Sequence, residues 1–551
     1  MKRHVEALVR RALSDAIQAG ELRTKEPPAF AVEVPADPKW GDLSTNAALV
    51  LARGEGRPPR AIAEALVRRL EGVVPAAWLA APPEIAGPGF VNFRLAPAFW
   101  QARLAEALAA GEAYGRSDAG AGRRAQVEFV SANPTGPLTV GHGRNAVIGD
   151  TLARLLAASG WNVEREYYFN NAGRQMTVLA ASVRARYLEL IGRDGAFPAD
   201  GYQGEYIRDI ARTLVEEHGD ALADVPEPDA FRAAAEGTIF ATIRATQERL
   251  GIVFDDYFNE DSLYRSSAIE RTLAALDARG LVERREGAVW LRGAAVGLAQ
   301  DRVLVKSSGE PAYRLPDIAY HVDKLGRGFD AIVDVLGADH IAEHEEVAAA
   351  LRALGHDTTR IRPVIYQFVT LTRHGEQVKM STRRAEYVTL DELLDEVGAD
   401  AARFFFLTRK SDSHLEFDLD LAKQQSTENP VFYVQYAHAR IASVFRQAAE
   451  ARVTPAADPD LSPLGDAEVE TLRVLATWPD VVETATHELE PHRVVFFALE
   501  LAGAFHRYYN RHRILTDDGA LTQARLALLR AVQQVLRAAL GIAGVAAPER
   551  M

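Results

Sequence analysis

Apolar residues recur along the middle of the chain in alternating strand and helix patterns. The stretches AQVEFVSA (125–132) and NVEREYYF (162–169) are typical of strands, and residues 142–159 between them carry apolar side chains at helical spacing up to Gly160. The elements predicted for a second half are a strand over 331–337, a helix over 341–353 and a strand over 362–369. This order predicts a doubly wound parallel sheet of the Rossmann type, which binds ligands at the carboxyl ends of its strands.

Different patterns flank this region and predict two further domains. Residues 1–115 read as an α/β module, followed by a Gly/Ala/Ser-rich linker over 115–124. Its predicted elements are helices over 2–20 and 60–71 and strands over 29–35 and 87–95. The central region would then span 116–427, with an insertion over about 180–300 and a connecting segment over 376–427. From 428 to 551 the apolar period is helical throughout, which predicts an all-α bundle.

Composition narrows the class of protein. The 551 residues are 48% hydrophobic and 25% charged, as in a soluble globular protein. The chain has no cysteine, which excludes disulfides, thiolate metal sites and a cysteine nucleophile. The N-terminal helix pattern is interrupted by charges and does not resemble a signal peptide, so we expect a cytoplasmic protein that does not bind membranes. The net charge of −13 means that any nucleic-acid contact must use a local basic surface.

Two short polar segments are candidates for phosphate binding. The turn from Thr135 to Arg144 contains three glycines and enters a helix, and a helix N-terminus offers free N–H groups to an anion. The segment from Gln377 to Arg384 carries three cations and two hydroxyls, which suits a clamp on a polyphosphate. Taken alone, the first segment is equally consistent with a tight strand-to-helix turn, and a basic run such as the second is more often a solvated surface.

Together the two segments resemble the signature motifs of class I aminoacyl-tRNA synthetases. Thr139-Val140-Gly141-His142 is similar to the His-x-Gly-His motif, and Lys379-Met380-Ser381-Thr382-Arg383 to the Lys-Met-Ser-Lys-Ser motif. VEFVSANPTGPL, YRLPDIAYHVDK, GADH and ENPVFYVQYAHARI resemble the arginyl family in particular, and the likeness extends over essentially the whole chain. One departure is Thr139, which stands where the family has its first histidine. Its hydroxyl can bond a phosphate oxygen but cannot carry an imidazolium charge.

The resemblance implies an arginine–tRNA ligase that makes arginyl-adenylate from ATP and arginine, then transfers arginine to the terminal ribose of tRNA(Arg). ATP would bind as its Mg²⁺ complex, with no zinc, haem or flavin and no protein metal site. Catalysis would use His142, Lys379 and Thr139. The residues implied for ATP binding are Thr139, Gly141, His142, Lys379, Met380, Ser381 and Arg383.

The resemblance also implies sites for arginine and tRNA. A guanidinium needs carboxylate partners, and Asp317 and Glu260 match the acidic positions, with Tyr313 beside them. Residues implied for the rest of the amino acid are Glu128, Asn133 and His340. For tRNA, the resemblance implies Phe90 and Asn92 at the elbow and, on the C-terminal domain, Arg507, Tyr508, Arg511 and Arg513. The aromatic members of that last group are equally consistent with a helix core. We expect a monomer.

Two other functions remain open from the sequence. One is a nucleotidyltransferase with the same phosphate site that condenses ATP with a small carboxylate and ignores RNA. The C-terminal domain argues against it, because such an enzyme has no use for an RNA-binding bundle. The other is an RNA-binding protein whose active site has decayed, for which Thr139 is the only sign.

Overall fold

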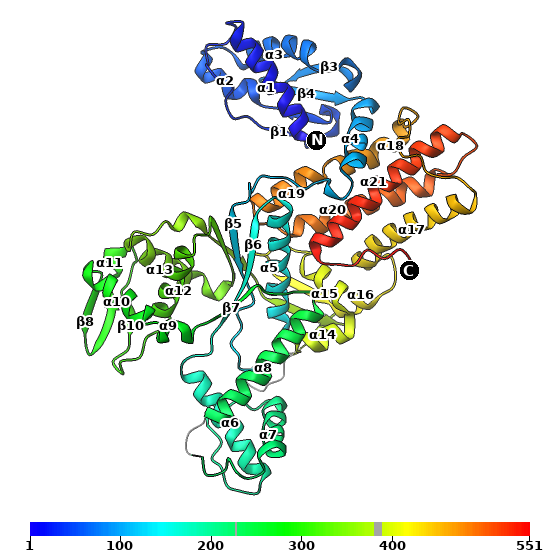
Figure 1. Ribbon diagram of the computed structural model, residues 1–551. Coiled ribbons are helices and arrows are strands. Elements are labelled where there is room, and N and C mark those ends of the chain that lie inside the picture. Colours follow the sequence, from blue (N-terminus) through cyan, green and yellow to red (C-terminus); the bar gives the residue numbers. More distant parts are fainter. Residues whose placement is uncertain (226–228, 379–387) are drawn as a thin grey trace.

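The computed structural model describes residues 1–225, 229–378 and 388–551. A five-stranded parallel sheet forms its centre (Figure 1). The strand order is β12-β11-β5-β6-β7. Their bounds are β5 Arg124–Glu128, β6 Asn162–Phe169, β7 Asp256–Asn259, β11 Ala331–Gly337 and β12 Ile361–Tyr366. The chain starts in the middle with β5 and adds strands first on one side and later on the other, so the switch point lies between β5 and β11. The predicted doubly wound sheet is confirmed.

Helices cover both faces of this sheet. Helix α5 (Val140–Ala158) connects β5 to β6, while α12 (Arg314–Gly326) and α13 (Ile341–Ala353) belong to a second apolar cluster. Along β11, Val333 and Val335 join the main core and Ile332 joins the cluster under α12. Because side chains alternate along a strand, Asp334 faces α12 as well. The strand therefore directs a charged residue into the buried layer between sheet and helix.

The predicted insertion over 180–300 is two insertions, because β7 lies inside that range and pairs with β6 as the edge of the core sheet. Its four residues, DYFN, are too short for their pattern to identify a sheet strand. Elements before β7 are α6 Arg174–Leu190, α7 Glu205–His218 and α8 Asp229–Arg249. Elements after it are α9 Asp261–Arg265, α10 Ala268–Ala278, β8 Val282–Arg285, β9 Ala288–Leu291, α11 Gly293–Val296 and β10 Arg302–Val305.

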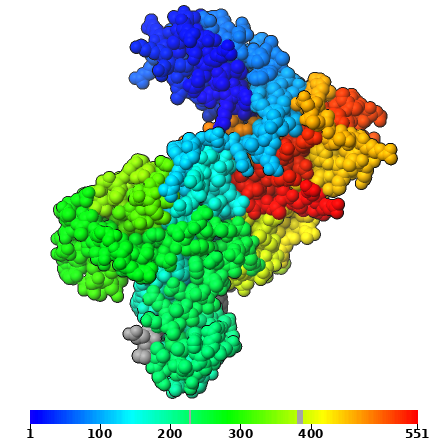
Figure 2. Space-filling model, in the orientation of Figure 1, coloured from blue at the N-terminus to red at the C-terminus, as the bar shows by residue number. Residues whose placement is uncertain are grey.

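The N-terminal region forms an antiparallel four-stranded sheet in the order β1-β2-β4-β3, covered by helices. Its elements are α1 Lys2–Gln18, β1 Val32–Glu33, β2 Leu43–Thr45, α2 Ala47–Glu55, α3 Pro59–Val73, β3 Leu79–Ala86, β4 Phe90–Leu95 and α4 Pro97–Ala110. Figure 2 shows this region at one end of an elongated molecule and the α6–α7 insertion at the other. The α4 helix packs on α18 and α21 of the C-terminal bundle.

The chain after β12 passes through a small sheet into a helical bundle. The small sheet and its helices are β13 Val369–Arg373, β14 Glu376–Gln377, α14 Leu390–Val397, α15 Ala399–Phe406, β15 Leu415–Asp418 and α16 Leu419–Lys423. The bundle consists of α17 Pro430–Glu450, α18 Asp466–Ala476, α19 Trp478–His487, α20 His492–Arg511 and α21 Gly519–Ala543. Helix α21 is long and apolar enough, by composition, to cross a membrane, but it packs against α17, α18 and α20 as a core helix of the bundle.

Candidate active site

The first signature turn places His142 at the N-terminus of α5 in a fixed orientation. The backbone N–H of Thr139 donates to His142 Nδ1 over 3.1 Å, and the Thr139 hydroxyl lies 3.2 Å from the same nitrogen. Nδ1 is therefore an acceptor, and the ring proton resides on Nε2. Burial lowers the pKa of His142 to about 4, so the ring is a neutral donor at pH 7. Thr139 thus holds the remaining histidine of the motif.

The residues on either side of the second signature segment are hydrogen-bonded to neighbouring elements. Lys379, Met380, Ser381 and Arg383 lie outside the described residues, but Val378 N–H donates to Leu371 O of β13 on one side. On the other side Leu390 N–H donates to Leu138 O over 2.7 Å, and Thr389 forms a bridge with Thr139. The chain at Thr389 and Leu390, which follows the second segment, is therefore joined to the turn that carries His142.

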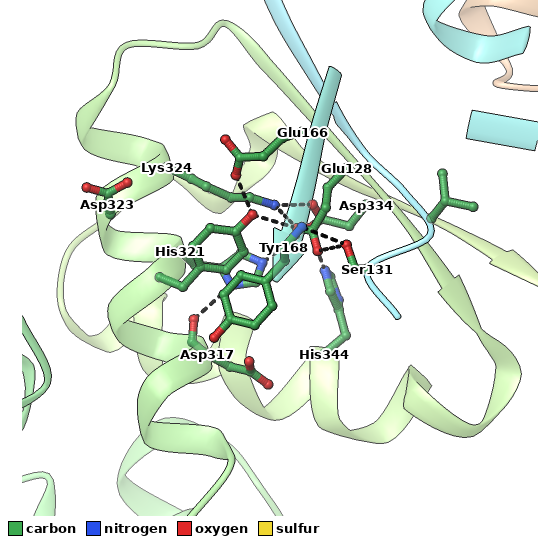
Figure 3. Close-up of polar contacts among 12 residues, drawn as sticks. Glu128, Ser131, Glu166, Tyr168, Asp317, His321, Asp323, Lys324, Asp334 and His344 are labelled. Atoms are coloured by element: carbon green, nitrogen blue, oxygen red, sulfur yellow. Dashed lines mark hydrogen bonds and ion pairs between the residues drawn. The ribbon is translucent and has the colours of Figure 1, made fainter. Parts of the chain in front are cut away.

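A row of three acids crosses the central sheet. Glu128 is in register with Asp334 on one neighbouring strand and with Glu166 on the other. Three like charges in a buried layer need cations. Lys324 of α12 donates to Glu128 and Asp334 (Figure 3). Arg327 donates to Glu166. Of this row, Glu128 and Asp334 line a cavity at the carboxyl ends of β5 and β11.

Beside this row, Asp317 and Glu260 have no lysine or arginine partner among the described residues. The Asp317 carboxylate, in the first turn of α12, has no hydrogen-bond partner among the described residues, and burial raises its pKa to about 7. Glu260 follows β7, is 7% exposed, and burial raises its pKa as well. The Tyr168 hydroxyl lies near both acids, and Tyr168 and Tyr264 lower the pKa of Glu260 against the effect of burial. Two carboxylates without a lysine or arginine partner, with a tyrosine hydroxyl beside them, fit a cationic ligand with several N–H donors.

Only some of the other residues predicted to contact the amino acid share a cavity with Asp317. Glu128, Asp317 and His340 line one cavity of about 90 Å³ at the carboxyl ends of β5 and β11. His340 is largely exposed and pairs with Glu343 over 3.4 Å. Asn133 is exposed in the loop after β5, and Tyr313 is 73% exposed at the start of α12. Neither lines the 90 Å³ cavity.

Several residues of the site were not singled out from the sequence. They are Tyr168, Tyr320, His321, Lys324, Asp334 and His344. A signal was present: Asp317, His321 and Lys324 fall at i, i+4 and i+7 on one helix face, and AIVDVLG carries one acid in an apolar strand. His321, Asp334 and His344 offer ligand atoms within 4.8 Å of one another, a set of metal-binding type. The Asp334 carboxylate, however, is already bonded to Lys324 and His321.

The two predicted RNA-binding regions lie far from this site. Phe90 is 40% exposed and Asn92 is buried, and both line a cavity of about 500 Å³ with Trp40. On α20 and just after it, Arg507, Arg511 and Arg513 are exposed, with Arg507 paired to Glu470. Tyr508 is 4% exposed and its hydroxyl donates to Glu468, so its ring is part of the helix core and not a free stacking face.

Comparison with known protein families matches nearly the whole chain. Residues 3–95 match the model of the arginyl tRNA synthetase N-terminal domain, and residues 103–415 match the class I (R) tRNA synthetase catalytic domain. Residues 434–551 match the DALR anticodon binding domain.

Individual relatives agree with the family models. The chain is 49% identical to an arginine–tRNA ligase of Desulfotalea psychrophila over the full length of both, and 48% identical to one of Salinibacter ruber, again over the full length of both. Its fold is similar to that of Thermus thermophilus arginyl-tRNA synthetase, with a TM-score of 0.76, 24% identity and complete coverage of both chains.

Proposed function

Because the chain belongs to the arginyl-tRNA synthetase family, we propose that it activates L-arginine with ATP and transfers it to the terminal ribose of tRNA(Arg). The observation that carries the choice of amino acid is the pair Asp317 and Glu260, two carboxylates whose pKa burial raises and which no lysine or arginine of the described residues pairs with. A guanidinium supplies the missing charge and five N–H donors.

In the first step a carboxylate oxygen of arginine attacks the α-phosphorus of ATP, and the bond to pyrophosphate breaks. Negative charge grows on the α-phosphate oxygens and on the leaving group, so the protein needs donors and not a nucleophile. The N-terminus of α5 and the Nε2 proton of His142 would bond the phosphate oxygens. Gly141 lets the nucleotide approach the backbone. Lys379, Met380, Ser381 and Arg383 would clamp the polyphosphate of ATP, which binds as its Mg²⁺ complex.

In the second step a hydroxyl of the terminal ribose attacks the carbonyl carbon of arginyl-adenylate, and AMP leaves. The substrate must stay in place between the two steps. We assign its guanidinium to Asp317, Glu260 and Tyr313, and its ammonium and carboxylate to Asn133, His340 and Glu128. Glu128 is held for this role by Ser131, Tyr320 and Lys324.

The tRNA would contact both ends of the molecule. The cavity with Phe90 and Asn92 suits the elbow, and the exposed Arg507, Arg511 and Arg513 suit phosphates near the anticodon. Tyr508 would support this surface from the core. We assign the protein to the cytoplasm as a monomer.

The test is aminoacylation of unfractionated tRNA with each of the twenty amino acids. We expect charging by arginine alone. Synthesis of an adenylate without tRNA charging would support the small-molecule nucleotidyltransferase instead, and tRNA binding without either reaction would support a decayed paralogue.

A further inference from the structure

His321 has a protonation state that its neighbours determine. It lies one turn after Asp317 on α12, buried, with Nδ1 2.8 Å from the Asp317 carbonyl oxygen and Nε2 3.2 Å from Asp334 Oδ2. A carbonyl oxygen and a carboxylate only accept hydrogen bonds, so both ring nitrogens must donate. Asp334 is a carboxylate because, although burial opposes it, Lys324 and its histidine neighbours hold its pKa well below the usual range. His321 is therefore an imidazolium.

We propose that His321 is a positioning residue for arginine, a buried cation that keeps the Asp317 carboxylate ionised so that the guanidinium meets an anion. The inference rests on the proposed function, since it needs Asp317 to bind the guanidinium.

The charges around Asp317 show why such a cation is needed. Burial is the largest influence that raises the pKa of Asp317 to about 7, and Glu343, Glu128 and Glu260 raise it further. His321 is the main influence in the opposite direction. Burial also opposes the charge of His321 itself, but Asp334 more than offsets this, and the pKa of His321 is raised. The remaining titratable groups around the two residues are Glu166, Tyr168, Tyr320, Lys324, His340 and His344.

His344 provides a matched control. Its Nε2 lies 3.6 Å from the same Asp334 oxygen, and its ring packs edge-on against His321 with centroids 6.2 Å apart. It is on α13, and no hydrogen bond joins it to Asp317 in the described residues. Replacing either histidine by asparagine removes a ring beside Asp334, but only the change at 321 removes the cation next to Asp317.

The experiment is calorimetric titration of the full-length protein with arginine from pH 6 to pH 9. A carboxyl with a pKa near 7 must lose its proton to bind a cation, so we expect the native Kd to fall about tenfold between pH 6 and pH 8. In His321→Asn the inflection should move up by about one pH unit or more. The variant would then bind about fivefold more weakly at pH 7 and approach the native Kd by pH 9. His344→Asn should follow the native curve.

Other outcomes separate this inference from the proposed function. If His321→Asn keeps the native inflection while Asp317→Asn weakens arginine binding and loses the inflection, the inference fails and the pocket assignment stands. If Asp317→Asn binds arginine as the native protein does, the pocket assignment itself fails. If His321→Asn does not fold, His321→Gln replaces it, and a native Kd that is constant from pH 6 to pH 8 overturns the inference without any variant.

Discussion

Thr139 orients His142, the remaining histidine of the signature turn. Its backbone N–H and hydroxyl both face His142 Nδ1, which orients the Nε2 proton outward. The side chain therefore acts through the neighbouring histidine, a role that the sequence pattern alone does not reveal.

Substitutions at Thr139 and His142 should differ in how much they lower kcat. Thr139→Ala keeps the backbone donor and loses the hydroxyl, which is worth about 1 kcal/mol, so we expect about a fivefold loss of kcat. His142→Ala removes a donor to the transition state and should cost about 10²–10³-fold. Thr139→Ser is the control and should retain near-native kcat in ATP–pyrophosphate exchange with tRNA present. Equal losses for Thr139→Ala and His142→Ala would show that Thr139 contacts the nucleotide directly.

The acidic and basic residues between the sheet and α12 were only partly predictable. Asp317, Glu260 and Glu128 were found through motif resemblance, whereas Lys324, His321 and Asp334 were not, because a charge in a strand or helix pattern usually indicates a solvated face. Their burial depends on the register of β5, β6 and β11, which brings Glu166, Glu128 and Asp334 into one row. Register is a property of the assembled sheet and cannot be read from one strand.

Strands and helices with a clear period were predicted well. The strand over 162–169 is β6 to the residue, and the helix over 142–159 is α5 within two residues. The strand predicted over 362–369 ends at Tyr366, since the chain leaves the core sheet there and starts β13 of another sheet at Val369. Continuous apolar runs do not show where a chain changes partners.

Helix α5 packs closely against α14, the helix that follows the second signature segment, and this packing can be tested by substitution at Gly143. A Cβ at Gly143 would lie 2.6 Å from Leu390 Cδ1 and 3.1 Å from Phe406, so Gly143→Ala must displace these side chains. We expect a loss of about 1–3 kcal/mol in the free energy of unfolding, measured by urea denaturation. Gly141→Ala, whose nearest contact is an ordinary 3.8 Å, should leave stability within about 0.5 kcal/mol of native. Equal stability of the two variants would contradict this packing.

Across the whole molecule, one buried arginine joins the catalytic region to the C-terminal bundle. Arg403 of α15 is 1% exposed, donates to Asp150 of α5 over 2.5 Å and to Ala543 O at the end of α21 over 2.8 Å. It also donates to Leu250 O, after α8. Three regions distant in sequence therefore share one guanidinium.

Removing this guanidinium should destabilise the contact between the catalytic region and the C-terminal bundle. Arg403→Met leaves Asp150 with Arg154 and Arg165 only and strips two carbonyls of their donor, so we expect a loss of about 3–5 kcal/mol in unfolding free energy. Calorimetry should then resolve the bundle as a separate transition. Arg409→Met, at an exposed position, is the control and should change stability by less than about 0.5 kcal/mol. A single native-like transition in Arg403→Met would show that apolar contacts alone hold the domains together.

The central claim is that Asp317 recognises the guanidinium, and citrulline tests it most directly because it has nearly the shape of arginine without the charge. The measurement is kcat/KM for arginine and citrulline in tRNA aminoacylation by the native protein and by Asp317→Asn. Loss of one charge-assisted partner should cost arginine at least ~2 kcal/mol, about 30-fold, and should reduce the arginine-to-citrulline ratio. The same ratio in both proteins would contradict the assignment of Asp317 to the guanidinium.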